Sequence, residues 1–198
     1  MSSEECRAAW GADTSRDRAQ NFDGRFPSCA CEEHSLQING FSVQNDELVA
    51  KIFTSPDTVD LETGEVVWNK LVRTYSDGLS MFRSGCTEQQ VRQIIQRLTT
   101  GGAVQTALAG AAVMTARVLR SAGNPDRWFC LYDTESADFD VHSDLIGTWP
   151  DAPSKTQLAK AKESRLRVLR NLFTSAFVVG TTADQLIEEL RARNFMIL

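Results

Sequence analysis

The stretch LSMFRSGCTEQQVRQIIQRLTTGG, residues 79–102, carries both kinds of secondary structure that the chain is expected to form. Its first five residues alternate in side-chain direction after a turn-forming Asp-Gly pair, which predicts a strand over residues 79–83. Thr87 and Gln90 form a capping-box pattern, and apolar residues then recur at helical spacing. We therefore predict a helix over residues 88–99, ended by a glycine pair.

Further strand-like and helix-like segments flank this stretch. Ser154 with Gln157, and Thr182 with Gln185, repeat the capping-box pattern ahead of apolar stripes. The predicted strands cover residues near 48–53, 65–68, 79–83, 111–120 and 127–133, and the predicted helices cover residues near 88–99, 155–176 and 183–193. Strands and helices are segregated rather than alternating, which indicates an α+β fold with a small antiparallel sheet.

Residues 103–120 fit two structures. Their alanine content favours a helix, whereas Gly110 and the turn-forming residues 123–126 favour a hairpin. We predict a strand over residues 111–120 and treat helix as the alternative.

Length and composition indicate one ordinary globular domain. The chain has 198 residues, of which 42% are hydrophobic and 24% charged. Residues 1–27 are polar and lack sustained periodicity, so we expect a flexible N-terminal arm ahead of a single domain at residues 28–198. No apolar run approaches the roughly 18 residues of a membrane span, and we expect no membrane partner.

The five cysteines are an odd, scattered set, which favours reduced thiols and a cytoplasmic location. Cys29, Cys31 and His34 form a C-x-C-x2-H cluster that could supply three ligands to zinc. A structural zinc site needs a fourth ligand, and the usual paired C-x2-C spacing is missing. Unligated thiols in a linker and redox activity remain the alternatives.

The segment YDTESADFDVHSDL, residues 132–145, places five carboxylates around one of the two histidines of the chain. Asp133 ends a predicted strand, and His142 and Asp144 share one face if the segment is extended. These three residues are the candidates for general acid–base catalysis or for a divalent manganese or magnesium ion. The alternative is structural: the basic helix that follows neutralises the acidic segment.

That basic helix, residues 155–170, carries six Lys or Arg residues against one Glu. It could bind an acidic partner, and Trp149, Lys160 and Arg167 are the candidate contact residues. It also has the pattern of an ordinary amphipathic surface helix. The net charge of −5 and the lack of interleaved aromatic residues argue against nucleic-acid binding overall.

The segments FTSPDTVDLETGEV, DGLSMFR and DTESADFDVHSDL resemble a group of small bacterial proteins of unassigned activity. That group shares a Thr-Gly-Glu turn, a Gly-Leu-Ser strand and an Asp-Thr…His-x-Asp segment. The resemblance covers residues 40–175 and implies a bacterial or phage source, and it emphasises Asp133, Thr134, His142 and Asp144. Ser143 departs from the Ala of the group.

Three functions are compatible with these features. The first is a non-catalytic accessory protein that binds a protein partner, since no complete catalytic constellation is present. The second is a metal-dependent, hydrolytic enzyme that uses the acidic segment 133–144. The third is a nucleic-acid-associated factor that uses the basic helix.

Overall fold

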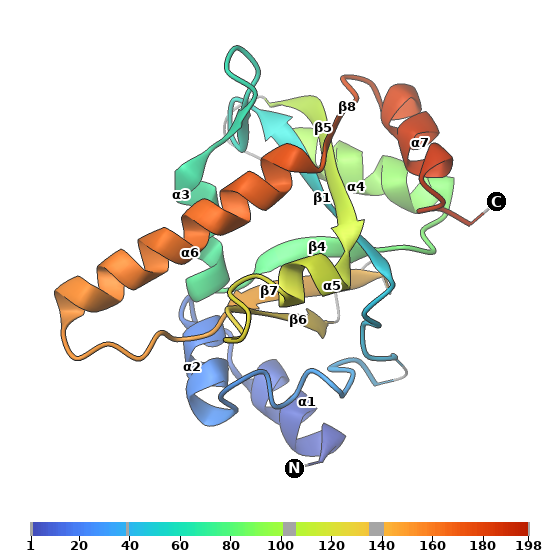
Figure 1. Ribbon diagram of the computed structural model, residues 1–198. Helices are drawn as coiled ribbons and strands as arrows, with labels where there is room; N and C mark the ends of the chain where they lie inside the picture. Colours follow the sequence, from blue (N-terminus) through green and yellow to red (C-terminus); the bar gives the residue numbers. More distant parts are fainter. Residues whose placement is uncertain (1, 39, 101–105, 135–140, 198) are drawn as a thin grey trace.

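The structure is a computed structural model that describes residues 2–38, 40–100, 106–134 and 141–197. Within these residues six strands form one antiparallel sheet, in the order β6-β7-β4-β1-β5-β8, and a two-stranded hairpin lies apart from it. The predicted α+β class is confirmed (Figure 1). The strands of the sheet are β1 (Leu48–Ser55), β4 (Leu79–Arg83), β5 (Ala107–Thr115), β6 (Phe129–Asp133), β7 (His142–Gly147) and β8 (Phe177–Val179), and the hairpin pairs β2 (Val59–Asp60) with β3 (Glu65–Val66).

Three predicted strands match β1, β4 and β6, and two predictions need correction. The strand expected at 65–68 ends at Val66, because α3 (Trp68–Leu71) begins two residues later. The strand expected at 111–120 ends at Thr115, and residues 116–120 form α5 (Ala116–Arg120). Strands β7 and β8 were not predicted, since each becomes extended by pairing with a distant partner strand.

The three helices with capping patterns are confirmed as α4 (Glu88–Thr100), α6 (Lys155–Ser175) and α7 (Ala183–Ala192). The hydroxyls of Thr87, Ser154 and Thr182 each accept the backbone N–H three residues on, at 3.3 Å. These bonds satisfy backbone N–H groups of the first turn, which have no acceptor within the helix. The glycine pair expected to end α4 lies outside the described residues.

The N-terminal residues are not the expected flexible arm. They form α1 (Ser3–Ala12) and α2 (Arg18–Arg25), which bury Cys6, Trp10 and Phe22. The Phe22 ring meets the rings of Trp10 and Tyr132 edge to face, at centroid distances of 5.2 Å. Aromatic packing against the sheet therefore orders a segment whose sequence has little periodicity.

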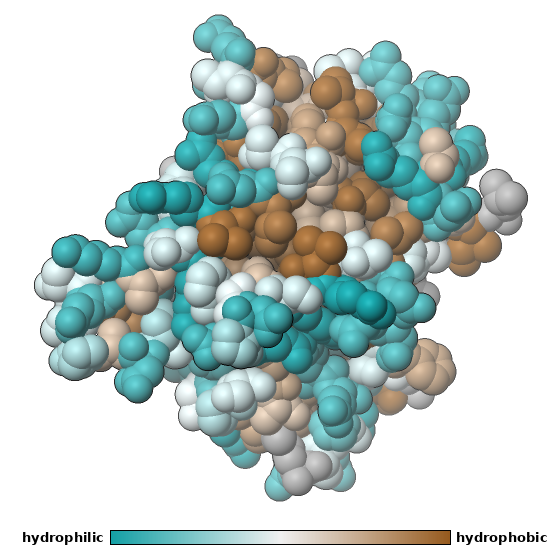
Figure 2. Space-filling model, viewed as in Figure 1, coloured by the Kyte–Doolittle hydropathy of each residue, from teal (hydrophilic) through white to brown (hydrophobic). Residues whose placement is uncertain are grey.

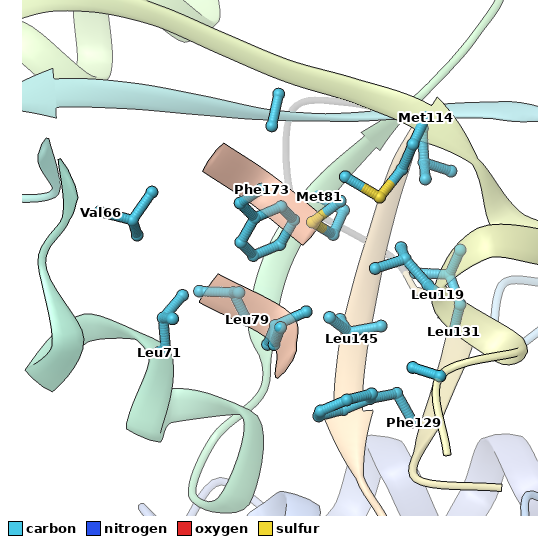
Figure 3. Close-up of a cluster of buried hydrophobic side chains, with 14 of the residues drawn as sticks. Val66, Leu71, Leu79, Met81, Met114, Leu119, Phe129, Leu131, Leu145 and Phe173 are labelled. Atoms are coloured by element: carbon cyan, nitrogen blue, oxygen red, sulfur yellow. The ribbon is translucent and has the colours of Figure 1, made fainter. Parts of the chain in front are cut away.

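The sheet has helices on both faces (Figure 1). One face packs under α6, α3, α5 and the 3-10 helix η1 (Val72–Tyr75), around a core that includes Met81, Leu145 and Phe173 (Figure 3). On the other face, α4 and α7 cover the half nearer β5, and α1 and α2 cover the half nearer β6. None of the described helices is both long and apolar enough to cross a bilayer.

Candidate functional site

Strand pairing separates the three residues of the predicted catalytic set. In the β6–β7 ladder Asp133 lies opposite Ser143, and Tyr132 lies opposite Asp144. Directly opposed residues of an antiparallel pair point to the same face, so the Asp133 side chain and the His142 and Asp144 side chains start on opposite faces of the sheet. The acidic segment is therefore two polar clusters. Glu135, Asp138 and Asp140 lie outside the described residues.

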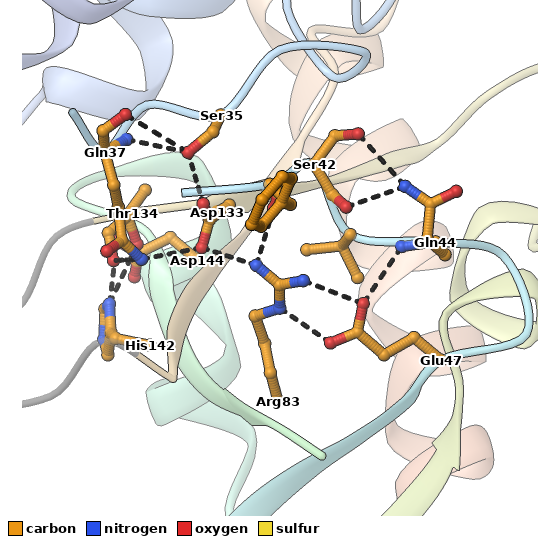
Figure 4. A network of polar contacts seen from close by, with 12 residues as sticks. Ser35, Gln37, Ser42, Gln44, Glu47, Arg83, Asp133, Thr134, His142 and Asp144 are labelled. Carbon is orange, nitrogen blue, oxygen red and sulfur yellow. Dashed lines mark hydrogen bonds and ion pairs between the residues drawn. The ribbon is translucent and has the colours of Figure 1, made fainter. Parts of the chain in front are cut away.

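The Asp133 carboxylate is fully buried and closely surrounded by donors (Figure 4). Arg83 Nη1 lies 2.7 Å from Oδ1, Gln37 Nε2 donates to the same oxygen at 2.7 Å, and the Ser35 hydroxyl donates to Oδ2. Arg83 also pairs with Glu47, with Nε 2.7 Å from Oε1. Charge compensation and hydrogen bonding of this kind stabilise a buried carboxylate and leave it little capacity to bind a substrate.

His142 and Asp144 are joined by a threonine hydroxyl (Figure 4). Thr134 Oγ1 donates to Asp144 Oδ2 at 3.0 Å and lies 2.8 Å from His142 Nδ1. A hydroxyl has one proton, and the carboxylate oxygen accepts it, so Nδ1 carries the hydrogen of that imidazole contact. Arg18, 4.0 Å from Asp144 Oδ2, supplies the nearest opposite charge.

For Asp133 and Asp144, the described carboxylates of this acidic segment, the basic helix is not the neutralising partner that the structural alternative expected. Among the described residues, no ion pair joins α6 to Asp133 or Asp144. Arg165 donates to the Thr148 backbone oxygen at 2.7 Å, and Arg170 pairs with Glu65. The compensating cations are Arg83 of β4 and Arg18 of α2. Both are far from the acidic segment in sequence, so local sequence patterns do not predict these contacts.

The predicted zinc cluster is divided between two disulfides. Cys6 pairs with Cys31, Cys29 pairs with Cys130, and Cys86 is a buried thiol outside both disulfides. The sulfurs of Cys29 and Cys31 are therefore not thiolates, and the expectation of reduced thiols is wrong for four of the five cysteines. Across the described ranges, no three His, Cys, Asp or Glu side chains are placed to hold a metal ion.

The same CACEEH segment contains a buried residue that sequence reasoning missed. Glu32 Oε1 accepts from Arg120 Nε at 2.8 Å and from the Leu131 backbone N–H at 2.7 Å, and Arg127 pairs with Oε2. Leu36 N also donates to the Asp133 backbone oxygen at 2.9 Å. This segment thereby covers the free edge of β6, as edge strands require. Its disulfides and Glu32 have a structural role.

The predicted contact residue Trp149 lies beside an open groove of about 500 Å³. Three aromatic side chains line it, Trp68, Tyr75 and Trp149, together with Lys162 of α6. The Lys162 ammonium lies 3.0 Å from the Trp149 ring centroid and 5.0 Å from that of Tyr75. This is a cation–π contact, in which the ring face attracts the positive charge.

Burial changes the titration of two of these side chains. It lowers the pKa of Lys162 to about 8 and raises the pKa of Tyr75 to about 12. The Tyr75 hydroxyl is buried and has no hydrogen-bond partner. An unsatisfied buried hydroxyl is uncommon, and the nearby Arg165 partly offsets the rise in the pKa of Tyr75.

The other two contact candidates, Lys160 and Arg167, are exposed on α6, and Arg167 pairs with Glu163 at 3.3 Å. Lys160 has no ion-pair partner within the described part of the chain. The buried residues of α6 begin only at Leu166, so residues 155–165 project beyond the core (Figure 1). In the space-filling view this half of the helix is mainly hydrophilic, with a few apolar residues between the charges (Figure 2).

Comparisons with protein-family models, curated proteins and solved structures find no match for the chain.

Proposed function

We propose that this protein is a non-catalytic interaction module that binds an acidic segment of a protein partner in the Trp149 groove. One observation carries the proposal: three aromatic side chains line a groove directly beside the half of α6 that buries no residue. Amphipathic aromatic rings with a nearby cation are typical of protein-binding surfaces.

Charge supports an acidic partner. The projecting half of α6 carries Lys155, Lys160 and Lys162, and none of them forms an ion pair with a described carboxylate. Opposite charge on a partner would speed association and fix its orientation. The basic residues farther along α6 are already paired with groups of this chain, so the unpaired positive charge of α6 lies on these three lysines. Of these, Lys162 lines the groove, together with the carboxylates of Asp17 and Glu163, and Glu163 is paired with Arg167.

The enzyme alternative has less support from the geometry. It requires Asp133, His142 and Asp144 to act together, whereas the β6–β7 register directs them to two faces of the sheet. The binding proposal requires no such convergence.

The expected location also changes. A cytoplasmic location followed from reduced thiols, and the two disulfides favour an oxidising compartment, where such bonds persist.

The test is selection of a library of short random peptides displayed on phage against the intact chain. We expect enrichment of acid-rich peptides with apolar residues, whose affinity falls as salt increases. Trp149→Ala should weaken the selected peptides about 10-fold or more, and Lys160→Glu should weaken them as well. Arg117→Glu, an equal charge change at an exposed site on α5 that does not line the groove, is the matched control.

Peptides that bind Trp149→Ala as tightly as the unaltered chain would contradict the proposal. Enrichment of basic peptides, or equal loss with Arg117→Glu, would also contradict it.

A further inference from the structure

Lys51 is a cation buried within the sheet. It lies on β1 between Val49 and Phe53, two residues of the main core, and is 9% exposed. Strand β1 pairs with β5 along its whole length. Its pairing with β4 covers only two residue pairs, Val49 with Arg83 and Ala50 with Phe82. The two strands part at Lys51, and a cavity lies between this end of β1 and the start of β4 at Leu79.

The cavity has a volume of about 150 Å³, and its walls are half apolar and half polar, with Lys51, Thr54, Asp57, Thr58, Lys70 and Arg73 on the polar side. The apolar side chains come from both strands and from the segments that cover them: Ile52, Phe53, Val66, Leu71, Leu79 and Leu98. Segment 66–76 separates this cavity from the Trp149 groove, and no residue of the segment lines both: Val66, Lys70, Leu71 and Arg73 line the cavity, and Trp68, Val72, Tyr75 and Ser76 line the groove. The cavity is therefore distinct from the groove of the proposed function.

Lys51 is the cavity's unpaired cation. Lys70 lies 2.6 Å from Asp57, and Arg73 lies 2.6 Å from Asp77. Around the Lys51 ammonium, no described carboxylate comes within 4.0 Å, and no described acceptor hydrogen-bonds to it. A buried charge without a partner is costly, and a bound anion offsets that cost.

Burial and the positive charge of Arg73 lower the pKa of Lys51 to about 8. Asp144 and Asp57 act in the opposite direction. The amine is therefore still mostly protonated near neutral pH and able to attract an anion.

We propose that this cavity binds a small monocarboxylate with a short apolar chain, whose carboxylate pairs with the Lys51 ammonium. A cavity of about 150 Å³ is large enough for a molecule the size of benzene, so the ligand has about six non-hydrogen atoms. The apolar walls suit a hydrocarbon chain, and one unpaired cation suits one negative charge. This proposal does not depend on the peptide-binding proposal.

The probe is butyrate, measured by isothermal titration calorimetry and by the increase in melting temperature that a ligand of the folded state produces. Butyramide, the neutral analogue, and inorganic phosphate are the comparison probes. We expect butyrate to bind and Lys51→Met to reduce its affinity about 10-fold or more. Lys70→Met, which removes a paired lysine of the same cavity, should keep most of the affinity.

A second measurement needs no variant. Butyrate affinity for the unaltered chain should fall about 10-fold between about pH 7 and about pH 9, as Lys51 loses its proton. Equal binding of butyramide, binding of phosphate without butyrate, or no binding of butyrate at saturating concentration would each overturn the proposal.

Discussion

Arg83 Nη1 lies 2.7 Å from Asp133 Oδ1, and this ion pair joins two strands that are not neighbours in the sheet. The side chain of Asp133 is 0% exposed and that of Arg83 is 14% exposed. The pair therefore fixes the end of β6 relative to β4, across β7. Asp133, the first candidate for a catalytic acid in the sequence, thus has a structural partner.

Asp133→Asn should lower the free energy of unfolding by about 3 kcal/mol, because Arg83 loses one of its two buried carboxylates. Urea denaturation measures this loss. Asp126→Asn, on an exposed loop, is the matched control and should change stability little. A double-mutant cycle with Arg83→Met should be strongly non-additive. Additive losses would mean that the two side chains do not stabilise each other.

Thiol titration of the denatured, non-reduced chain should find one reactive thiol, that of Cys86, because the other four cysteines are paired. A count near five reactive thiols per chain would show that the native chain is reduced.

The two disulfides should differ in their effect on stability. Cys29–Cys130 spans 101 residues and Cys6–Cys31 spans 25. Loop-closure entropy predicts losses of about 4–5 and about 3–4 kcal/mol when each pair is replaced by serines. Chemical denaturation of the two double variants measures the difference. A larger loss for Cys6–Cys31 would indicate that packing of α1, rather than loop length, dominates.

Lys51→Met should stabilise the chain near neutral pH, because it removes a buried, unpaired charge. The pKa of Lys51 is about 8 when folded against an ordinary value of 10.5. Below pH 8 both states hold the proton, and the folded chain bears the full cost of the charge. Between about pH 8 and 10.5 the unfolded chain holds more protons, so the unaltered chain gains stability as pH rises, by at most about 3 kcal/mol.

The measurement for Lys51 is urea denaturation of both chains across that pH range. The stabilising effect of Lys51→Met should shrink towards zero as pH rises through the window. Lys70→Met is the control, since Lys70 is half-exposed and paired with Asp57. A constant difference between Lys51→Met and the unaltered chain at all pH values would contradict the assignment of this titration to Lys51.

Tyr75→Phe should leave the stability unchanged or raise it by up to about 1 kcal/mol, because it removes a buried hydroxyl that has no hydrogen-bond partner. Thermal melting measures this change. A clear destabilisation would show that the hydroxyl is satisfied in the folded protein, by water for example.

Local sequence patterns were enough to predict three helices and three strands of the sheet. Each of α4, α6 and α7 begins with a hydroxyl that accepts a backbone N–H three residues on, and this signal depends only on near neighbours. Strands β1, β4 and β6 were likewise visible as short β-compatible runs between turn residues. The segregation of these elements was enough to predict the α+β class.

Which distant residues contact one another could be seen only in the folded chain. The ion pair of Asp133 with Arg83, the disulfide of Cys29 with Cys130 and the contact of Lys162 with Trp149 join residues that local patterns treat separately. Residues 3–12 and 18–25 are ordered as helices because Trp10 and Phe22 pack with Tyr132 of β6. Strand β7 is extended because β4 and β6 pair with it on either side. Burial and charge compensation depend on which groups folding brings within a few ångströms of one another. For that reason the acidic segment resembled a catalytic site in the sequence, whereas in the fold its described residues belong to two polar clusters on opposite faces of the sheet.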